Sequence, residues 1–218
     1  MLLMLEELFN LLLHPASVVL LSYLLGSMSF AVIVSHLMGL SDPRSYGSKN
    51  PGATNVLRSG NKKAAALTLL LDALKAWVPV VWVLNHGADF GLDERTAAAA
   101  GMTVFLGHLF PVFFKFKGGK GVATALGVLM GISPLLGIAV ALTWLSVAWF
   151  TRYSSLAALM AAILAPVYYA LLGDVVWWSF DGAIFALLCA MGTLLVWRHR
   201  DNVNRLIAGT ETKIGAKK

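Results

Sequence analysis

Long apolar segments take up most of this chain, and they limit what it can fold into. A helix needs about 20 apolar residues to cross the hydrocarbon core of a bilayer. The segment from Val122 to Phe150 is too long for one span, and proline at Ser133-Pro134 is expected to divide it. The predicted spans are then about 17–40, 64–84, 96–114, 121–132, 134–151, 153–172 and 175–197. The sequence therefore predicts an all-α polytopic membrane protein with seven transmembrane helices.

The composition agrees with a membrane protein and not with a soluble one. Hydrophobic residues make up 58% of the chain and charged residues 13%, whereas soluble domains carry about 25% charged residues. The polar loops are short, so we expect a single membrane domain over residues 1–218. The net charge of +6 would suggest nucleic acid in a soluble protein, but here the basic residues lie between apolar segments. No nucleic-acid partner is expected.

The distribution of basic residues predicts the orientation in the membrane. Lys and Arg prefer cytoplasmic loops, and 15 of the 17 fall in the segments 41–63, 115–120, 152 and 198–218. With seven spans these four segments lie on the same side. The N-terminus is then outside and the C-terminus cytoplasmic. At the N-terminus, Glu6 and Glu7 replace the positive region of a cleaved signal, so a short interfacial helix is expected before the first span.

The first polar loop, Ser45 to Arg58, combines small hydrogen-bonding residues with cations. Glycine lets backbone amides approach a ligand closely, successive amides can bind an anion, and the guanidinium of Arg58 fits phosphate oxygens. A simple polar turn between helices is the alternative interpretation. The candidate ligand-binding residues are Ser48, Asn50, Thr54, Asn55 and Arg58.

The second polar loop, Phe116 to Thr124, stands directly before an apolar helix. A helix start offers free N–H groups and a positive dipole end, which favour anions. The loop is not a Walker A motif, because Gly121 follows Lys120 where that motif requires Ser or Thr. A flexible basic hinge is the alternative to a phosphate site. The candidate residues are Lys117, Gly118, Gly119, Lys120 and Gly121.

Two further polar groups occur at or within the spans. His199 and Asn202 are three residues apart just after the last span, where a basic headgroup anchor is the alternative to a site. Asp72 and Lys75 are three apart within the second span, so an ion pair is expected. Intramembrane charge indicates function by default, although a structural pair is equally consistent. The lone cysteine, Cys189, makes no zinc site, and no metal site is predicted.

Four segments together resemble the bacterial acyl-phosphate:glycerol-3-phosphate acyltransferases. They are YGSKNPGATNVLR, GHLFPVFFKFKGGKGVATALG, RYSSLAA and RHRDNVNRL with GTETKIG, and the match runs in order from about Tyr23 to Ile214. The resemblance implies an enzyme of the bacterial inner membrane with its active site on the cytoplasmic face. It would transfer a fatty acyl group from acyl phosphate to the 1-hydroxyl of sn-glycerol 3-phosphate, giving lysophosphatidate and phosphate.

The resemblance also implies roles for individual residues. Ser48, Arg58 and Lys120 match catalytic residues around the substrate phosphates, as do His199 and Asn202. Gly118, Gly119 and Gly121 match the loop associated with acyl phosphate, and Glu211 matches a structural glutamate of the tail. Lys49 and Lys115 depart from the pattern, because glycine is usual at both positions.

No cofactor is expected, because acyl phosphate is already an activated mixed anhydride. The expected partners are glycerol 3-phosphate, acyl phosphate and membrane lipids, and a monomer is expected. Two other functions fit the same topology. One is a transporter of a phosphorylated solute, although transporters often have repeated halves and no inverted repeat is visible. The other is an acyltransferase that uses acyl-CoA or acyl carrier protein.

Overall fold

The computed structural model describes residues 11–173 and 179–215, so most of the predicted N-terminal interfacial helix lies outside the described residues. The regular structure of the described residues is helical, as predicted. The helices form two compact units, Met1–Ile132 and Ser133–Lys218.

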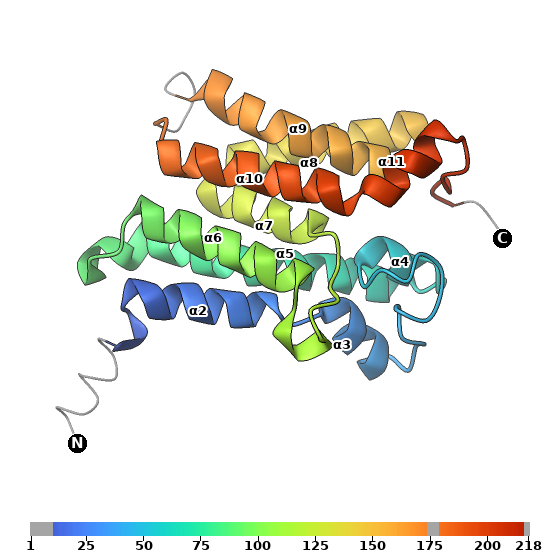
Figure 1. Cartoon of the computed structure of the whole chain (residues 1–218), viewed down its shortest axis with the longest axis horizontal. Helices are drawn as coiled ribbons and strands as arrows, with labels where there is room; N and C mark the ends of the chain where they lie inside the picture. The colour runs from blue at the N-terminus through green and yellow to red at the C-terminus, as the bar shows by residue number, and fades with distance from the viewer. Residues whose placement is uncertain (1–10, 174–178, 216–218) are drawn as a thin grey trace. The chain divides into compact units, whose positions relative to one another are not determined.

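The first unit is built around one long central helix. The 25-residue helix α5 packs against α2, α3, α4, α6 and α7. At about 1.5 Å per residue it extends about 37 Å, enough to cross a bilayer. The elements of this unit are α2 (Pro15–Gly26), α3 (Phe30–Leu37), α4 (Ala53–Leu57), α5 (Lys62–His86), η1 (Gly87–Phe90), α6 (Glu94–Leu109), η2 (Val112–Phe114) and α7 (Val122–Ile132) (Figure 1).

The segment expected as one span over 17–40 is instead two helices that meet at a bend of 45°. The side chain of Ser27 caps the end of α2 by donating to the carbonyl of Tyr23, and it also accepts the amide of Val112. Ser29 then takes an extended conformation before α3 begins. Serine competes for backbone hydrogen bonds in this way at helix ends. The break leaves the carbonyl of Met28 available to a side chain of α5.

Small residues let the helices of this unit approach closely. A Cβ added to Gly26 would collide with the backbone of Val104, and one added to Gly107 would collide with the carbonyl of Tyr23. These contacts join α2 to α6. A Cβ on Gly127 would collide with the backbone of Ala73, which joins α7 to α5. Membrane helices commonly pack through such small residues.

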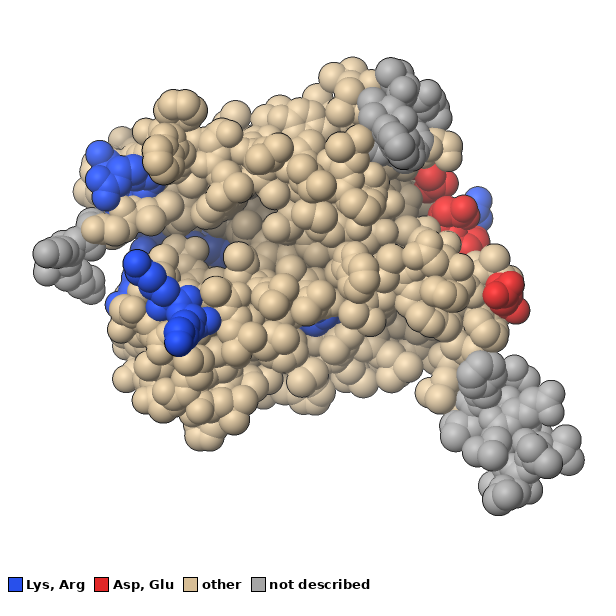
Figure 2. Space-filling model, turned by 180° about the vertical axis from the view of Figure 1, so that it is seen from behind, with Lys and Arg blue, Asp and Glu red and all other residues tan. Residues whose placement is uncertain are grey.

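Acidic and basic residues lie at opposite ends of the long helices of this unit. Asp89, Asp93 and Glu94 lie at the turn from α5 to α6, whereas Lys62 begins α5 and Lys115 follows α6. In Figure 2 the red side chains lie together on the right, with one blue side chain beside them. Arg95, in the first turn of α6, is the exception among the basic residues of these helices. This separation is the one that the distribution of Lys and Arg predicted.

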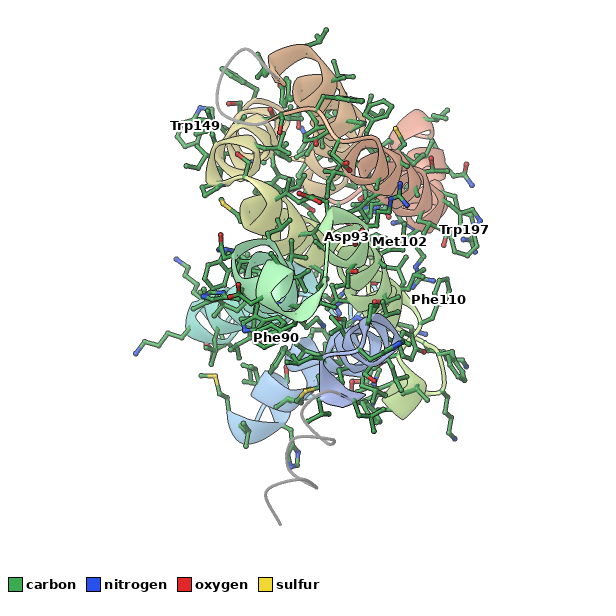
Figure 3. All side chains as sticks on the ribbon, turned by 90° about the vertical axis from the view of Figure 1, so that its left-hand side faces the viewer. Phe90, Asp93, Met102, Phe110, Trp149 and Trp197 are labelled. Atoms are coloured by element: carbon green, nitrogen blue, oxygen red, sulfur yellow. The ribbon has the colours of Figure 1, made fainter. Side chains whose placement is uncertain are left out.

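The second unit contains α8 (Pro134–Thr151), α9 (Ser154–Leu172), α10 (Gly182–Arg198) and α11 (Arg200–Ile207). Helix α8 begins at Pro134 with Ser133 as its N-cap, where the sequence predicted a break. Asp181 caps α10 by accepting the amide of Ile184. The seventh predicted span, 175–197, falls partly outside the described residues. Trp149 and Trp197 point outward (Figure 3), with 82% and 47% exposure, as expected of side chains that face lipid or its interface.

Within the described residues, four helices are long and apolar enough to cross a membrane. Counting the bent pairs α2–α3 and α10–α11 as one span each gives six. Helix α7 has 11 residues, about 16 Å of helix, which is shorter than a full span. The described residues thus form an all-helical fold with four to six candidate membrane spans.

The contact between α5 and α7 gives a test of the packing. Gly127→Ala should lower the thermal unfolding temperature in detergent, because overpacking typically costs about 1–3 kcal/mol. Gly182→Ala is the matched control, since a Cβ there meets nothing within 4 Å. Tryptophan fluorescence during heating measures the unfolding temperature of both variants. Equal unfolding temperatures for the two variants would contradict the close approach of α7 to α5.

Candidate active site

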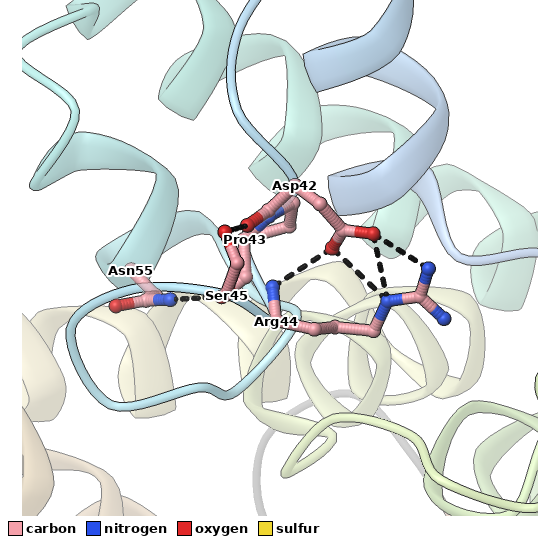
Figure 4. A network of polar contacts seen from close by, with 5 residues as sticks. All are labelled: Asp42, Pro43, Arg44, Ser45 and Asn55. Carbon is pink, nitrogen blue, oxygen red and sulfur yellow. Dashed lines mark hydrogen bonds and ion pairs between the residues drawn. The ribbon is translucent and has the colours of Figure 1, made fainter.

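Asn55 organises the first polar loop from inside. Its side-chain amide donates to the carbonyls of Pro43 (2.6 Å) and Tyr46 (3.2 Å), and its carbonyl accepts the amide of Ser48 (3.0 Å). Figure 4 shows Asn55 beside the turn that Asp42 and Ser45 close. Asn55 is buried, so its amide holds the loop in shape.

The groups that this loop presents outward are Ser48, Thr54 and Arg58, which are all exposed, and Asn50, which is half-buried. The guanidinium of Arg58 lies 3.4 Å from the side-chain carbonyl of Asn55. A Cβ on Gly47 would meet that same oxygen and the Arg58 side chain. Gly47 therefore lets Arg58 lie close against the loop, next to Ser48.

The two lysines that depart from the family pattern both stand in the left-handed conformation. The φ angle is 54° at Lys49 and 53° at Lys115. Glycine adopts this conformation without strain, whereas other residues are disfavoured. The glycine that the resemblance implies would therefore fit both positions without strain, and both lysine side chains are exposed.

The second polar loop folds back on the end of α6. The amide of Gly118 donates to the carbonyl of Leu109 (3.2 Å), and that of Gly119 donates to the carbonyl of His108 (3.1 Å). A Cβ on Gly118 would collide with the His108 carbonyl, and one on Gly121, at φ 83°, would collide with the ring of Phe105. The glycines thus allow close approach to α6, a use that the sequence did not indicate.

Helix α7 begins immediately after this loop, at Val122. The first amides of a helix have no partner within the helix, and the dipole makes this end positive. Lys117 is exposed, and Lys120, two residues before the helix, is half-buried. The end of the loop therefore combines two cations with a helix start, which is an arrangement that favours an anion.

The two loops lie together in the first unit. A Cβ on Gly119 would lie 3.0 Å from the carbonyl of Pro51. The guanidinium of Arg44 also lies 5.3 Å from the ring centre of Phe114, within the range of a cation–π contact. Residues of both predicted phosphate loops are therefore neighbours, as a shared site would require.

Beneath the second loop is a buried polar cluster. The expected ion pair is present, with Lys75 Nζ 2.8 Å from Asp72 Oδ1, and both side chains are 2% exposed or less. Lys75 also lies 3.0 Å from Nδ1 of His108 on α6 and donates to the carbonyl of Met28 at 2.7 Å. The cluster connects α5, α6 and the break between α2 and α3. No group of three His, Cys, Asp or Glu suited to a metal occurs among the described residues.

The third motif belongs to the second unit. His199 lies where α10 ends and α11 begins at an angle of 57°, and both His199 and Asn202 are buried. Nδ1 of His199 lies 2.8 Å from the carbonyl of Leu195. A carbonyl can only accept, so Nδ1 carries a proton and Nε2 carries the lone pair of the neutral ring. This is the tautomer that a general base needs at Nε2.

Glu211 holds the tail against the third motif. It accepts hydrogen bonds from Asn202 (2.6 Å), Ser155 (2.7 Å) and Arg205 (2.7 Å). Burial disfavours the charged carboxylate, but these hydrogen bonds together outweigh burial and keep the pKa of Glu211 below its usual value. Its carboxylate links α9, α11 and the tail. The sequence did not identify Ser155 or Arg205 as its partners.

Comparison with known proteins identifies the family. The family model described as glycerol-3-phosphate acyltransferase matches residues 16–209. Proteins named glycerol-3-phosphate acyltransferase are 63% identical in Paraburkholderia phymatum (92% of this chain, 93% of theirs) and 58% identical in Albidiferax ferrireducens (93% and 90%).

Two crystal structures have the same fold. Both are of PlsY (YgiH), described as an integral membrane glycerol 3-phosphate acyltransferase. The glycerol 3-phosphate form has a TM-score of 0.84 at 39% identity, over 92% of this chain and 96% of that one. The lysophosphatidic acid form has a TM-score of 0.82 at 38% identity, over 92% and 95%. With the family model covering nearly the whole sequence, the chain belongs to the glycerol-3-phosphate acyltransferase family.

Proposed function

We propose that this protein transfers a fatty acyl group from acyl phosphate to the 1-hydroxyl of sn-glycerol 3-phosphate. The observation that carries the proposal is the meeting of the two glycine-containing basic loops, with Pro51 of one against Gly119 of the other, in a chain of the glycerol-3-phosphate acyltransferase family. The reaction brings together two anionic substrates, which repel each other. Cations and helix-start amides offset that repulsion.

The proposed arrangement in the membrane follows the charges of the first unit. The basic loops would face the cytoplasm of a bacterial cell, in the inner membrane, and the acidic turn after α5 would face outward. Helices α2 and α3 would count as one span, α7 as a short span and α10 as the seventh. The N-terminus is then outside and the C-terminus inside. We propose that one monomer suffices, with membrane lipids around it.

The substrate phosphates are assigned to the cations of the two loops and the start of α7. Arg58 offers a forked donor beside Ser48, and Lys120 precedes the helix start. Asn50, Thr54 and Lys117 supply further donors at the same loops. Donors aimed at the oxygen that gains charge stabilise an acyl-transfer transition state.

In the proposed step the 1-hydroxyl oxygen attacks the acyl carbonyl carbon. The bond between that carbon and the phosphate oxygen then breaks, and inorganic phosphate leaves. The hydroxyl proton goes to Nε2 of His199 or to a substrate phosphate. The Leu195 carbonyl supports the first route, because it holds the proton of His199 at Nδ1. Asn202 and Glu211 would then position α11, the helix that follows His199.

The donor specificity provides the first test. Purified protein with synthetic acyl phosphate and glycerol 3-phosphate should release phosphate and form lysophosphatidate in equal amounts. Acyl-CoA and acyl carrier protein should give no product above the background without enzyme. A chromatographic assay measures the lysophosphatidate formed from each of the three donors. Acylation from a thioester donor alone would contradict the proposal, and transport of the phosphorylated solute without acylation would favour a transporter.

The second test concerns Arg58. Arg58→Ala should raise the KM for glycerol 3-phosphate about 10- to 100-fold, since a hydrogen bond to a charged group contributes about 1.5–3 kcal/mol. Arg95→Ala is the matched control, because Arg95 is exposed at the acidic end of α6. Steady-state kinetics in detergent measure both variants. An unchanged KM for glycerol 3-phosphate in Arg58→Ala would remove Arg58 from phosphate binding.

A further inference from the structure

The ammonium of Lys75 is enclosed by three polar atoms deep in the first unit. They are the carbonyl oxygen of Met28 at 2.7 Å, Oδ1 of Asp72 at 2.8 Å and Nδ1 of His108 at 3.0 Å. Its side chain is 1% exposed. An uncompensated charge at such a depth is very costly. The three neighbours supply the compensation.

The protons of the Lys75 ammonium determine which nitrogen of the His108 ring is protonated. An ammonium has three donors and no acceptor. The Met28 carbonyl can only accept, so it takes one of these protons, while Asp72 neutralises the charge as the ion-pair partner. A second proton is directed to Nδ1 of His108 at 3.0 Å, and Nδ1 must then carry a lone pair. The single ring proton of a neutral His108 is therefore on Nε2.

Nε2 of His108 faces the second polar loop. A Cβ on Gly119 would collide with Nε2, and the same Cβ would lie 3.0 Å from the carbonyl of Pro51. The backbone of His108 holds the same point of the loop, because its carbonyl accepts the Gly119 amide at 3.1 Å. Ring and backbone of one residue thus fix the place where both polar loops meet.

We propose that His108, oriented by Lys75 and Asp72, is a positioning residue that sets the conformation of the loop from Gly118 to Lys120. The assignment rests on the proposed function for what the loop binds, namely the phosphate of the acyl donor. Lys75 fixes the ring from its Nδ1 side, and Nε2 fixes Gly119 from below. The loop then presents Lys120 and the start of α7 in one arrangement before substrate arrives. Such preorganisation lowers the cost of binding.

Two amide variants separate the two sides of the ring. In His108→Asn the shorter amide replaces Nδ1, so it still meets Lys75 but no longer reaches Gly119. In His108→Gln the longer amide replaces Nε2 and still reaches the loop. His108→Asn should raise the KM for acyl phosphate about tenfold, because the loop loses the contact that holds it in the binding conformation, and leave the KM for glycerol 3-phosphate within about twofold. His108→Gln should recover most of the lost affinity.

The thermal unfolding temperature is recorded for both variants, since a merely structural role would change stability without this separation of KM values. Equal KM values for acyl phosphate in the two variants would overturn the proposal. An equal rise in both KM values of His108→Asn would do the same.

The tautomer can be measured without any activity. In wild-type protein labelled with ¹⁵N-histidine, the ring nitrogens of His108 should show an unprotonated Nδ1 and a protonated Nε2. The signal is assigned by its absence from His108→Gln, or by elimination with variants of His14, His36, His86 and His199 if that variant does not fold. A proton on Nδ1 would overturn the inference whatever the enzyme does. Inactive wild-type protein with the expected tautomer would instead count against the proposed function alone.

Discussion

The buried charge of Lys75 is the interaction on which the first unit depends. Lipid and protein provide no water to solvate it, so the chain must bring acceptors to it. Asp72 comes from the same helix, whereas the Met28 carbonyl becomes available only because the chain breaks between α2 and α3. His108 completes the set from α6. One ammonium thereby joins three segments and connects the helix interior to the loop above it.

The polar groups of the proposed site lie in loops at the ends of these helices, because the hydrocarbon core of a membrane disfavours polar groups. Glycines at the helix contacts bring the backbones close together, and glycines after α6 bring the second loop onto that helix. The buried side-chain amide of Asn55 holds the first loop. The exposed groups that remain, Ser48 and Arg58, then stand on a fixed frame. Acyl phosphate needs no further activation, so placing two anions is the main task of such a site.

Sequence patterns predicted the features that depend on neighbouring residues. Apolar length predicted the helices, Ser133-Pro134 predicted a break, and the spacing of Asp72 and Lys75 predicted their ion pair. Contacts between distant segments carry no such pattern. His108 is 33 residues from Lys75, and Ser155 is 56 residues from Glu211. The bend after α2 depends on such contacts. So do the hydrogen bonds from the amides of Gly118 and Gly119 to α6. Only the structure revealed these features.

The central claim is that both polar loops face the cytoplasm and serve one site. Single cysteines at Lys49 and Lys117, in a chain with Cys189→Ser, can be labelled with a membrane-impermeant maleimide, because both lysines are exposed. A cysteine at Asp89, at the acidic end of α5, serves as the opposite-side control. Inside-out vesicles should label the first two positions, and intact spheroplasts should label only the third. Labelling of Lys49→Cys and Lys117→Cys from opposite faces would contradict a shared site.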